Sequence, residues 1–539
     1  MRSRRHQRAS AKGACEMGLF DYIKDRAEFD VAQKVVKKGM ALARQAQIAT
    51  ERSSTYIANT DKVSANLCAA GIEEVLAGAT TGQNGQSFTQ DQHLRGTEVL
   101  DCTERLMQEQ LWGQMQPGQL QLGFVPIEQR DEWQHFLLAG APGTGKSMSI
   151  KWMLDTIRQR DEKALIFDPV GDMVGTFYRP GHDIILNPLD ERDAGWYPWA
   201  DLERHELPAF VKAIIPDPIG QQDPFWANAA QAVLQSLLLG TRNMDDLLRF
   251  GLVEPDNVLM DVVRKTGKGG LVGQEKTFSG VRAQLATGLD KLALLRNITQ
   301  EEYKAGAGFS LKKWTENDDD RRWVFLLSKK AQQEALKPLI TLWTDTVIRT
   351  ALSLEPSPQR RVWLCLDELP SLGKLPSLAS AMAEGRKFGL SCVLGLQTIQ
   401  QLRQTYGKEE AAVVYGLPKN RLILRIHDSE TCEEMSKELG EYQRRRVTTS
   451  TNSGSNNGSS SGGGLFGNNH SGSSNGMSTS EQLVTERAVM PAEIANLPDL
   501  VGYLRTDHQV AKVTLPVTGW PEVQPQHVDI PQRRMPWEI

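Results

Sequence analysis

The spacing of hydrophobic and polar positions changes several times along this chain of 539 residues. In residues 17–118, apolar residues recur at steps of three and four, which predicts a mainly helical N-terminal region. From residue 119 onward, short apolar runs alternate with helical stretches, a pattern typical of a parallel or mixed central sheet covered by helices. The strands predicted from these runs are 136–140, 164–168, 183–187, 323–327, 362–367, 392–397, 421–426 and 509–517.

Between Trp196 and about Asn297 the strand pattern stops and the periodicity is helical alone. We therefore predict an α/β fold in which an all-α domain is inserted into the sheet domain. The expected divisions are a helical region at 1–118 with its first 16 or so residues disordered, a first sheet part at 119–195, an all-α insertion at 196–299 and a second sheet part at 300–539.

Residues 448–480 consist almost entirely of Ser, Thr, Asn and Gly and carry no formal charge. Such a composition offers too little apolar surface to offset the entropy lost on ordering. We predict a disordered loop, inserted between segments that again have structured patterns.

The overall composition is that of a soluble globular protein, with 40% hydrophobic and 24% charged residues. A formal net charge of −4 provides no general attraction to nucleic acid, so any contact with DNA must be local. The six cysteines contain no CxxC pair, which argues against a disulfide framework or a zinc site. No apolar stretch approaches the 18 to 20 or so residues of a transmembrane helix, and the chain is expected to be cytoplasmic.

Candidate chemistry begins with GAPGTGKS at 140–147, which follows a predicted strand and precedes a predicted helix. In such a phosphate-binding loop the glycines let backbone N–H groups approach the phosphates, Lys146 reaches the β- and γ-phosphates, and the Ser147 hydroxyl ligates Mg²⁺. The predicted nucleotide-binding residues are Gly140, Ala141, Pro142, Gly143, Thr144, Gly145, Lys146, Ser147 and Met148.

An acidic pair, Asp367 and Glu368, ends the predicted strand in RVWLCLDELP. Asp367 would hold the metal directly or through water, and Glu368 would orient or deprotonate an attacking water, which favours continuous hydrolysis over a simple switch. Gln397, at the end of the next predicted strand, is either a sensor of the γ-phosphate or an ordinary polar strand end. Arg386 is either a solvated arginine or a group that completes a neighbouring subunit's site.

Six blocks in this order resemble the coupling proteins of conjugative type IV secretion systems, the TraD/TrwB-type family. The blocks are HFLLAGAPGTGKS, ALIFDPVGDM, IILNPLDER, RVWLCLDELPSLGKLPSLASAMAEGRKFGL, GLQTIQQL and MPAEIANLPDL, which lie between about residues 120 and 515. The resemblance implies a RecA-like P-loop domain with an inserted all-α domain, assembled as a homo-hexameric ring.

The resemblance also implies a DNA-dependent ATPase that uses ATP and Mg²⁺ to drive single-stranded DNA, received with a relaxase, toward the secretion channel. Expected partners are DNA, relaxase or relaxosome proteins, and channel ATPases or a separate membrane anchor. Position by position, it implies nucleotide binding by Lys146 and Ser147, metal and water activation by Asp367 and Glu368, phosphate sensing by Gln397 and a trans-acting role for Arg386.

Two features depart from the family pattern. Members of the family usually begin with two membrane-spanning helices, and residues 1–118 contain nothing of that kind. Two explanations stay open: the protein docks onto a separate partner at the inner membrane, or it is a soluble relative with a different task. The uncharged segment at 448–480 is a second departure. Two alternatives stay open: a soluble DNA motor of the FtsK/HerA kind in another DNA-processing role, and a cargo receptor that uses nucleotide only to assemble.

Overall fold

The structure, a computed structural model, describes residues 88–530 except most of 105–115, and except 218–222, 268–274, 456–472 and His508. The chain divides into two units, residues 1–90 with 447–481 and residues 91–446 with 482–539. The second unit holds the central sheet and all predicted site residues. Most of the helical pattern predicted for 1–118 lies outside the described residues.

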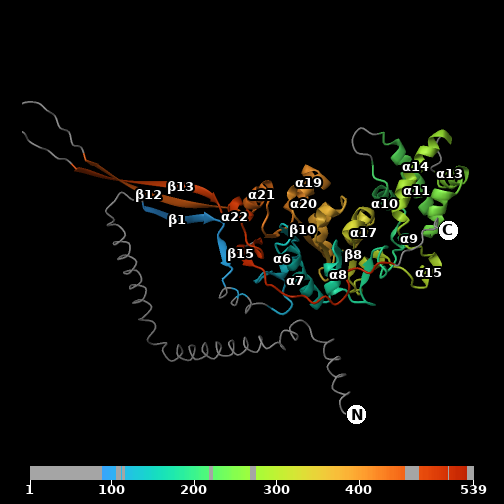
Figure 1. The fold of residues 1–539 in the computed structure, drawn as a ribbon, viewed down its shortest axis with the longest axis horizontal. Helices are drawn as coiled ribbons and strands as arrows, with labels where there is room; N and C mark the ends of the chain where they lie inside the picture. The colour runs from blue at the N-terminus through green and yellow to red at the C-terminus, as the bar shows by residue number, and fades with distance from the viewer. Residues whose placement is uncertain are drawn as a thin grey trace, which may run out of the picture. The chain divides into compact units, whose positions relative to one another are not determined.

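A ten-stranded sheet forms the centre of the second unit (Figure 1). From β11 to β7 the neighbouring strands run parallel, whereas β14 runs antiparallel to both of its neighbours. This confirms the predicted α/β fold with a mixed sheet. In spatial order the strands are β2 (Val99–Cys102), β15 (Val510–Thr514), β14 (Val501–Arg505), β11 (Asn420–Ile423), β5 (Phe136–Ala139), β10 (Leu390–Leu396), β9 (Val362–Leu366), β6 (Lys163–Asp168), β8 (Val324–Leu327) and β7 (Ile184–Leu186).

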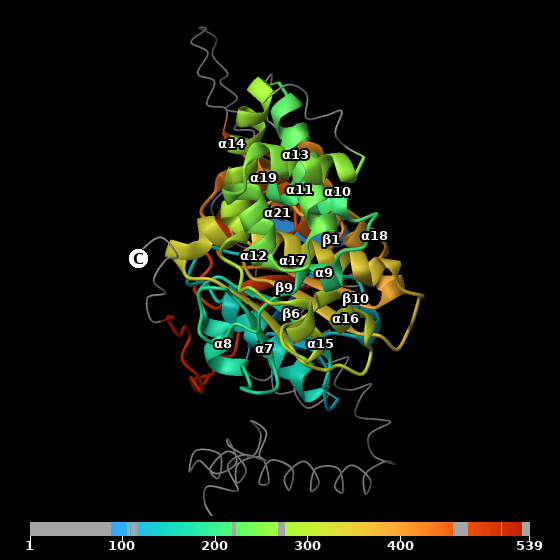
Figure 2. The same ribbon diagram turned by 90° about the vertical axis from the view of Figure 1, so that its right-hand side faces the viewer.

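Each central strand contributes to two hydrophobic cores, because successive side chains of a strand point to opposite faces. In β5, Leu137 and Ala139 join one core, while Phe136 and Leu138 join the other. Helices α7 (Lys146–Gln159) and α8 (Asp172–Phe177) cover the second face (Figure 2). The first face is covered by α17 (Gln333–Ser353), α18 (Leu378–Glu384), α19 (Ile399–Tyr406), α20 (Lys408–Gly416) and α21 (Ser429–Leu439).

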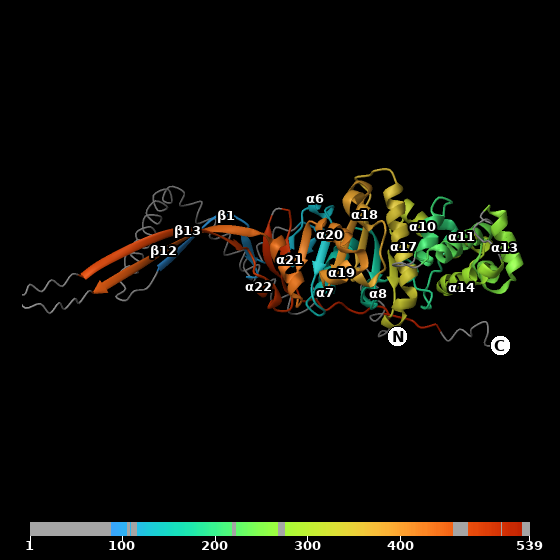
Figure 3. The ribbon, with the colours of Figure 1, turned by 90° about the horizontal axis from the view of Figure 1, so that it is seen from above.

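The chain between β7 and β8 is helical wherever the structure describes it, apart from its connecting segments (Figure 3). Its side chains share a core with the sheet, since Phe210 and Leu234 belong to the same cluster as Leu165 and Val324. The boundaries of an inserted domain at 196–299 stay a prediction. The helices are α9 (Pro198–Asp201), α10 (Leu207–Ile214), α11 (Phe225–Gly240), α12 (Met244–Leu248), the π-helical η1 (Arg249–Val253), α13 (Asp256–Lys265), α14 (Glu275–Leu292), α15 (Gln300–Lys304) and α16 (Leu311–Glu316).

The remaining elements are short or lie at the margins. They are β3 (Gln121–Leu122), β4 (Val125–Pro126), α6 (Gln129–Glu132), α22 (Pro491–Ala495) and the 3₁₀ turns η3 (Lys330–Gln332), η4 (Leu369–Ser371) and η5 (Gly385–Phe388). Within the described ranges, no helix has the length and apolarity needed to cross a membrane.

Two expectations need correction. A mainly helical region was predicted at 17–118, but within it the structure has β1 (Phe88–Gly96) and β2, and β2 pairs with β15 so that Val99 faces Val510. Backbone partners at the sheet edge outweigh the local helical periodicity. Disorder was predicted from 448, but β12 (Glu441–Ser455) and β13 (Ser473–Arg487) extend into that segment and form a sheet with β1. Strand pairing uses backbone groups, which Ser and Thr also carry; the middle, 456–472, lies outside the described residues.

Candidate active site

The GAPGTGKS loop connects the carboxyl end of β5 to the start of α7. Gly143 and Gly145 have φ of 80° and 114°, a left-handed conformation that favours glycine. A Cβ at Gly145 would also lie 2.7 Å from Leu515 Cδ1. The Ala141 amide donates to the Arg425 carbonyl over 2.9 Å, so the loop is anchored to the chain beyond β11. These contacts fix a turn whose following helix presents free N–H groups, which favours binding of an anion.

The loop meets the acidic pair directly. Lys146 Nζ lies 2.9 Å from Glu368 Oε2, and Ser147 Oγ donates to Asp367 Oδ2 over 2.9 Å. These contacts arise because β5 and β9 lie on either side of β10 with their carboxyl ends at one edge. Residues more than two hundred positions apart in sequence therefore form one site.

Gln397, directly after β10, also reaches this site, with Nε2 donating to Glu368 Oε2 over 2.9 Å. The approach depends on Gly395, where a Cβ would lie 1.9 Å from the Asp367 carbonyl oxygen. β10 can therefore lie against the end of β9 only with glycine at that position. The sequence interpretation singled out Gln397 but missed Gly395, whose lone signal was a glycine inside an apolar strand.

Asp367 is buried, and burial raises the pKa of its carboxyl, while the Lys146 charge and the Ser147 hydrogen bond act in the opposite direction. Its second oxygen, Oδ1, is buried without a hydrogen-bond partner among the described residues. An unpartnered carboxylate oxygen beside a serine hydroxyl is a donor set that suits a hard cation such as Mg²⁺. These residues therefore fit the predicted metal.

Asp168, at the end of β6, serves the turn that follows. Its carboxylate accepts hydrogen bonds from the amides of Gly171 over 2.7 Å and Val174 over 2.8 Å. Asp172 starts α8 and lies 2.6 Å from Lys151 Nζ. Asp168 thus holds the turn after β6, and Asp172 lies in the first turn of α8.

Arg386 lies elsewhere in the same chain. It is exposed in η5, just before the amino end of β10, whereas Gln397 follows the carboxyl end of that strand. Seven strand residues span about 23 Å at roughly 3.3 Å each. Within the described part of the chain its side chain makes no hydrogen bond or ion pair, and the structure does not bring it to Glu368.

A segment that the sequence interpretation left unassigned beyond residue 517 crosses the α7 and α8 face. Residues 516–530, here called the C-terminal strap, place Trp520 with its ring centroid 5.7 Å from Trp152 and 5.4 Å from Phe177. The Val523 amide donates to the Gly175 carbonyl over 2.8 Å. A Cβ at Gly171 would lie 2.9 Å from the strap, which explains a glycine that the phosphate chemistry does not require.

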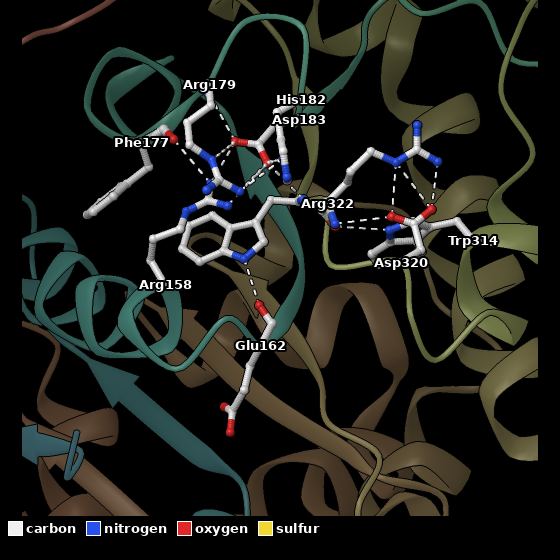
Figure 4. A network of polar contacts seen from close by, with 10 residues as sticks. Arg158, Glu162, Phe177, Arg179, His182, Asp183, Trp314, Asp320 and Arg322 are labelled. Carbon is white, nitrogen blue, oxygen red and sulfur yellow. Dashed lines mark hydrogen bonds and ion pairs between the residues drawn. The ribbon is translucent and has the colours of Figure 1, made fainter. Parts of the chain in front are cut away.

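The opposite end of α7 is held by a polar network at the amino edge of the sheet (Figure 4). Arg158 forms an ion pair with the buried Asp183 at 2.7 Å, and its guanidinium lies 3.4 Å from the Trp323 ring centroid. Asp183 also accepts from the Trp323 amide over 3.1 Å. Because α7 carries Lys146 in its first turn and Arg158 in its last, this network fixes the helix that presents the lysine.

Together, the parallel sheet and the loop with its acidic pair define a P-loop protein of the RecA-like class. The family model of the type IV secretion-system coupling protein DNA-binding domain matches residues 119–516, and the chain belongs to this family.

Relatives and solved structures agree with this assignment. The coupling protein TraD of Escherichia coli K12 is 27% identical over 465 residues, covering 83% of this chain and 61% of TraD. A conjugal transfer protein TraG of Escherichia coli is 26% identical over 295 residues, covering 47% of this chain and 44% of TraG. The chain thus spans about three fifths of TraD's length.

Two solved structures of the conjugative coupling protein TrwB are also similar. An unbound form is 29% identical with a TM-score of 0.65, covering 83% of this chain and 98% of that one. A complex with ADP and Mg²⁺ is 29% identical with a TM-score of 0.64, covering 83% and 99%.

Proposed function

We propose that this chain is an ATP-hydrolysing DNA translocase that couples a relaxase–DNA complex to a type IV secretion channel during conjugation. The observation that carries the proposal is the direct contact of Glu368 with Lys146, beside the Ser147–Asp367 pair. A loop that merely holds a nucleotide does not require this glutamate, whereas hydrolysis requires a base or an orienting group near the attacking water.

ATP and Mg²⁺ are the ligands that the site is built for. The TrwB structures, which include complexes with ADP and Mg²⁺ and with the non-hydrolysable analogue ADPNP, support this assignment. The loop amides and Lys146 would bind the phosphates, and Ser147 with Asp367 would hold the metal. Bound Mg²⁺ neutralises phosphate charge as it develops in the transition state.

Glu368 has a second task in the cycle. Its Oε2 accepts from both Lys146 and Gln397, so a phosphate that engages Lys146 competes for that contact. When Lys146 leaves Glu368 for the phosphate, the Glu368 carboxylate is free to orient water. Gln397 then senses whether the γ-phosphate is present. This exchange links nucleotide state to the position of β10, which is how hydrolysis would reach moving parts.

Arg386 acts in a neighbouring subunit under this proposal. Its exposed place at the amino edge of β10 leaves it far from its own Glu368 and available to another copy. We accordingly expect a homo-hexameric ring, with single-stranded DNA, relaxase proteins and channel ATPases or a separate membrane anchor as partners.

The test compares wild type, Glu368→Gln and the control Glu355→Gln, an exposed glutamate away from the site. ATP hydrolysis should be stimulated by single-stranded DNA, and the stimulation should fall as salt rises because phosphate contacts release counterions. Glu368→Gln should still bind ATP but hydrolyse it at least about 100-fold more slowly. Glu355→Gln should behave as wild type.

Two other outcomes would select other functions. Hydrolysis indifferent to DNA at low salt, with cargo transfer intact in Glu368→Gln, would indicate a receptor that uses nucleotide only to assemble. Full DNA-stimulated hydrolysis in a protein whose gene has no relaxase or secretion genes beside it would favour the FtsK/HerA-like motor.

A further inference from the structure

A groove of about 520 Å³ lies between helices of the segment that joins β7 to β8 and helix α17, which covers the sheet. No residue of the GAPGTGKS loop lines it. One wall is α10 with Lys291 of α14, and the other is α17 with the loop 373–377. Figure 3 shows α10 beside α17. The apolar part of the lining is aliphatic and is formed by Ala209, Ala213, Pro216, Pro338, Leu342 and Pro376.

Basic side chains surround this apolar floor. The lining contains Lys212, Lys291, Lys337, Arg349 and Lys374, against one carboxylate among the described lining residues, Asp345. Three of these cations have acidic partners, as in the pair of Lys212 with Asp217 at 2.8 Å. Lys337 has no hydrogen bond or ion pair within the described part of the chain. Lys291 Nζ donates to the Ile214 carbonyl over 2.6 Å and has no described carboxylate partner.

The groove is also joined to the segment that carries the catalytic glutamate. The chain reaches Gly373 shortly after Glu368, and the Gly373 amide donates to Thr341 Oγ1 on α17 over 2.9 Å. The Ser377 amide donates to Asp345 Oδ1 over 3.0 Å. An occupant of the groove would therefore press on the strand-end segment that positions Glu368.

We propose that this groove docks an acidic amphipathic helix of a partner protein. Aliphatic side chains of that helix would lie on the Ala, Pro and Leu floor, and its carboxylates would pair with Lys291 and Lys337. Nucleic acid fits less well, because single strands bind by stacking on aromatic rings and none of the described lining residues is aromatic.

The test uses the full chain and fluorescence anisotropy. The probe is a labelled synthetic helix of about 14 residues with Leu at i, i+3, i+4 and i+7 positions and Glu elsewhere, and its control has Lys in place of Glu. We expect the Glu peptide to bind and the Lys peptide to bind at least about tenfold more weakly. Lys337→Glu and Ala209→Trp, which reverses one charge and fills the floor, should each weaken the Glu peptide by about tenfold or more.

Lys304→Glu on α15 makes the same charge change outside the groove and should leave binding unchanged. Failure of the Glu peptide to bind, or equal binding by Lys337→Glu and Ala209→Trp, would overturn the proposal. Displacement of the peptide by oligo-dT or by phosphatidylglycerol vesicles at lower concentration would also overturn it, in favour of a nucleic-acid or membrane surface.

An effect of the peptide on ATP hydrolysis rests on the proposed function, whereas its binding does not. If the protein binds the peptide but does not hydrolyse ATP, the result would contradict the proposed ATPase function and leave the proposed docking groove standing.

Discussion

The glycine at position 395 offers a direct test of how the site is assembled. In Gly395→Ala the new Cβ would lie 1.9 Å from the Asp367 carbonyl oxygen, and real Cβ contacts are essentially never closer than 3.0 Å. β10 must therefore move away from the end of β9 by about 1 Å, which overpacks a buried strand at a cost of about 1–3 kcal/mol. That shift carries Gln397 away from Glu368.

A displacement of this size near a reacting group lowers rates on the order of 100-fold. We therefore expect the kcat for ATP hydrolysis, measured by phosphate release, to fall about 100-fold in Gly395→Ala. Nucleotide binding should be retained, because the GAPGTGKS loop itself is unchanged. The control is Gly416→Ala at the end of α20, where a Cβ would meet no described atom within 4 Å. A normal kcat and thermal midpoint in Gly395→Ala would refute the claim that this contact positions the glutamate.

Three more predictions concern the fold and the assembly. Burial lowers the pKa of His135 to about 4 from 6.5, so the unfolded chain binds the extra proton, and unfolding free energy should rise by about 3 kcal/mol between pH 4 and 6.5. His135→Asn should remove that rise in denaturant titrations. Arg386→Ala should bind ATP but lose hydrolysis about 100-fold, and mixing it with Glu368→Gln should restore part of the activity. Trp520→Ala should lower the thermal midpoint, with a loss of about 1–3 kcal/mol for its two ring contacts.

Each of these three predictions has a control or a refuting outcome that the structure provides. Asn suits position 135, because the backbone there has φ of 59° and Asn tolerates that conformation; an unchanged pH slope in the variant would contradict the assignment. Lys387→Ala, exposed beside Arg386, should keep full activity. Mixtures without recovered activity would argue against a role in trans. On the strap, the exposed Val517 offers the matched substitution Val517→Ala, which should leave the midpoint unchanged.

The C-terminal strap and the polar network at the end of α7 have a similar structural role. Each holds α7 or α8 against the sheet, away from the residues of the candidate active site. The strap contacts the turn formed by Asp168 and Gly171, and the network fixes the last turn of α7. Changes there are expected to act on stability first and on hydrolysis through the placement of Lys146.

Much of the site was predictable from sequence because its chemistry is local. A phosphate-binding loop needs glycine, lysine and serine in a fixed order directly after a strand, and the acidic pair needs only the end of another strand. The predicted strands at 136–140, 164–168 and 362–367 correspond to β5, β6 and β9. The resemblance to the coupling-protein family rests on the order of such blocks.

Only the tertiary structure decided which of these pieces meet. The order of strands puts β10 between β5 and β9, and this order brings Gln397 to Glu368 and makes Gly395 indispensable. Neither β2 at 99–102 nor the strands that enter 448–480 could be found from periodicity, because their backbone partners lie far away in the chain. Local patterns encode which face of an element is apolar, whereas strand order, register and close backbone approach depend on the whole fold.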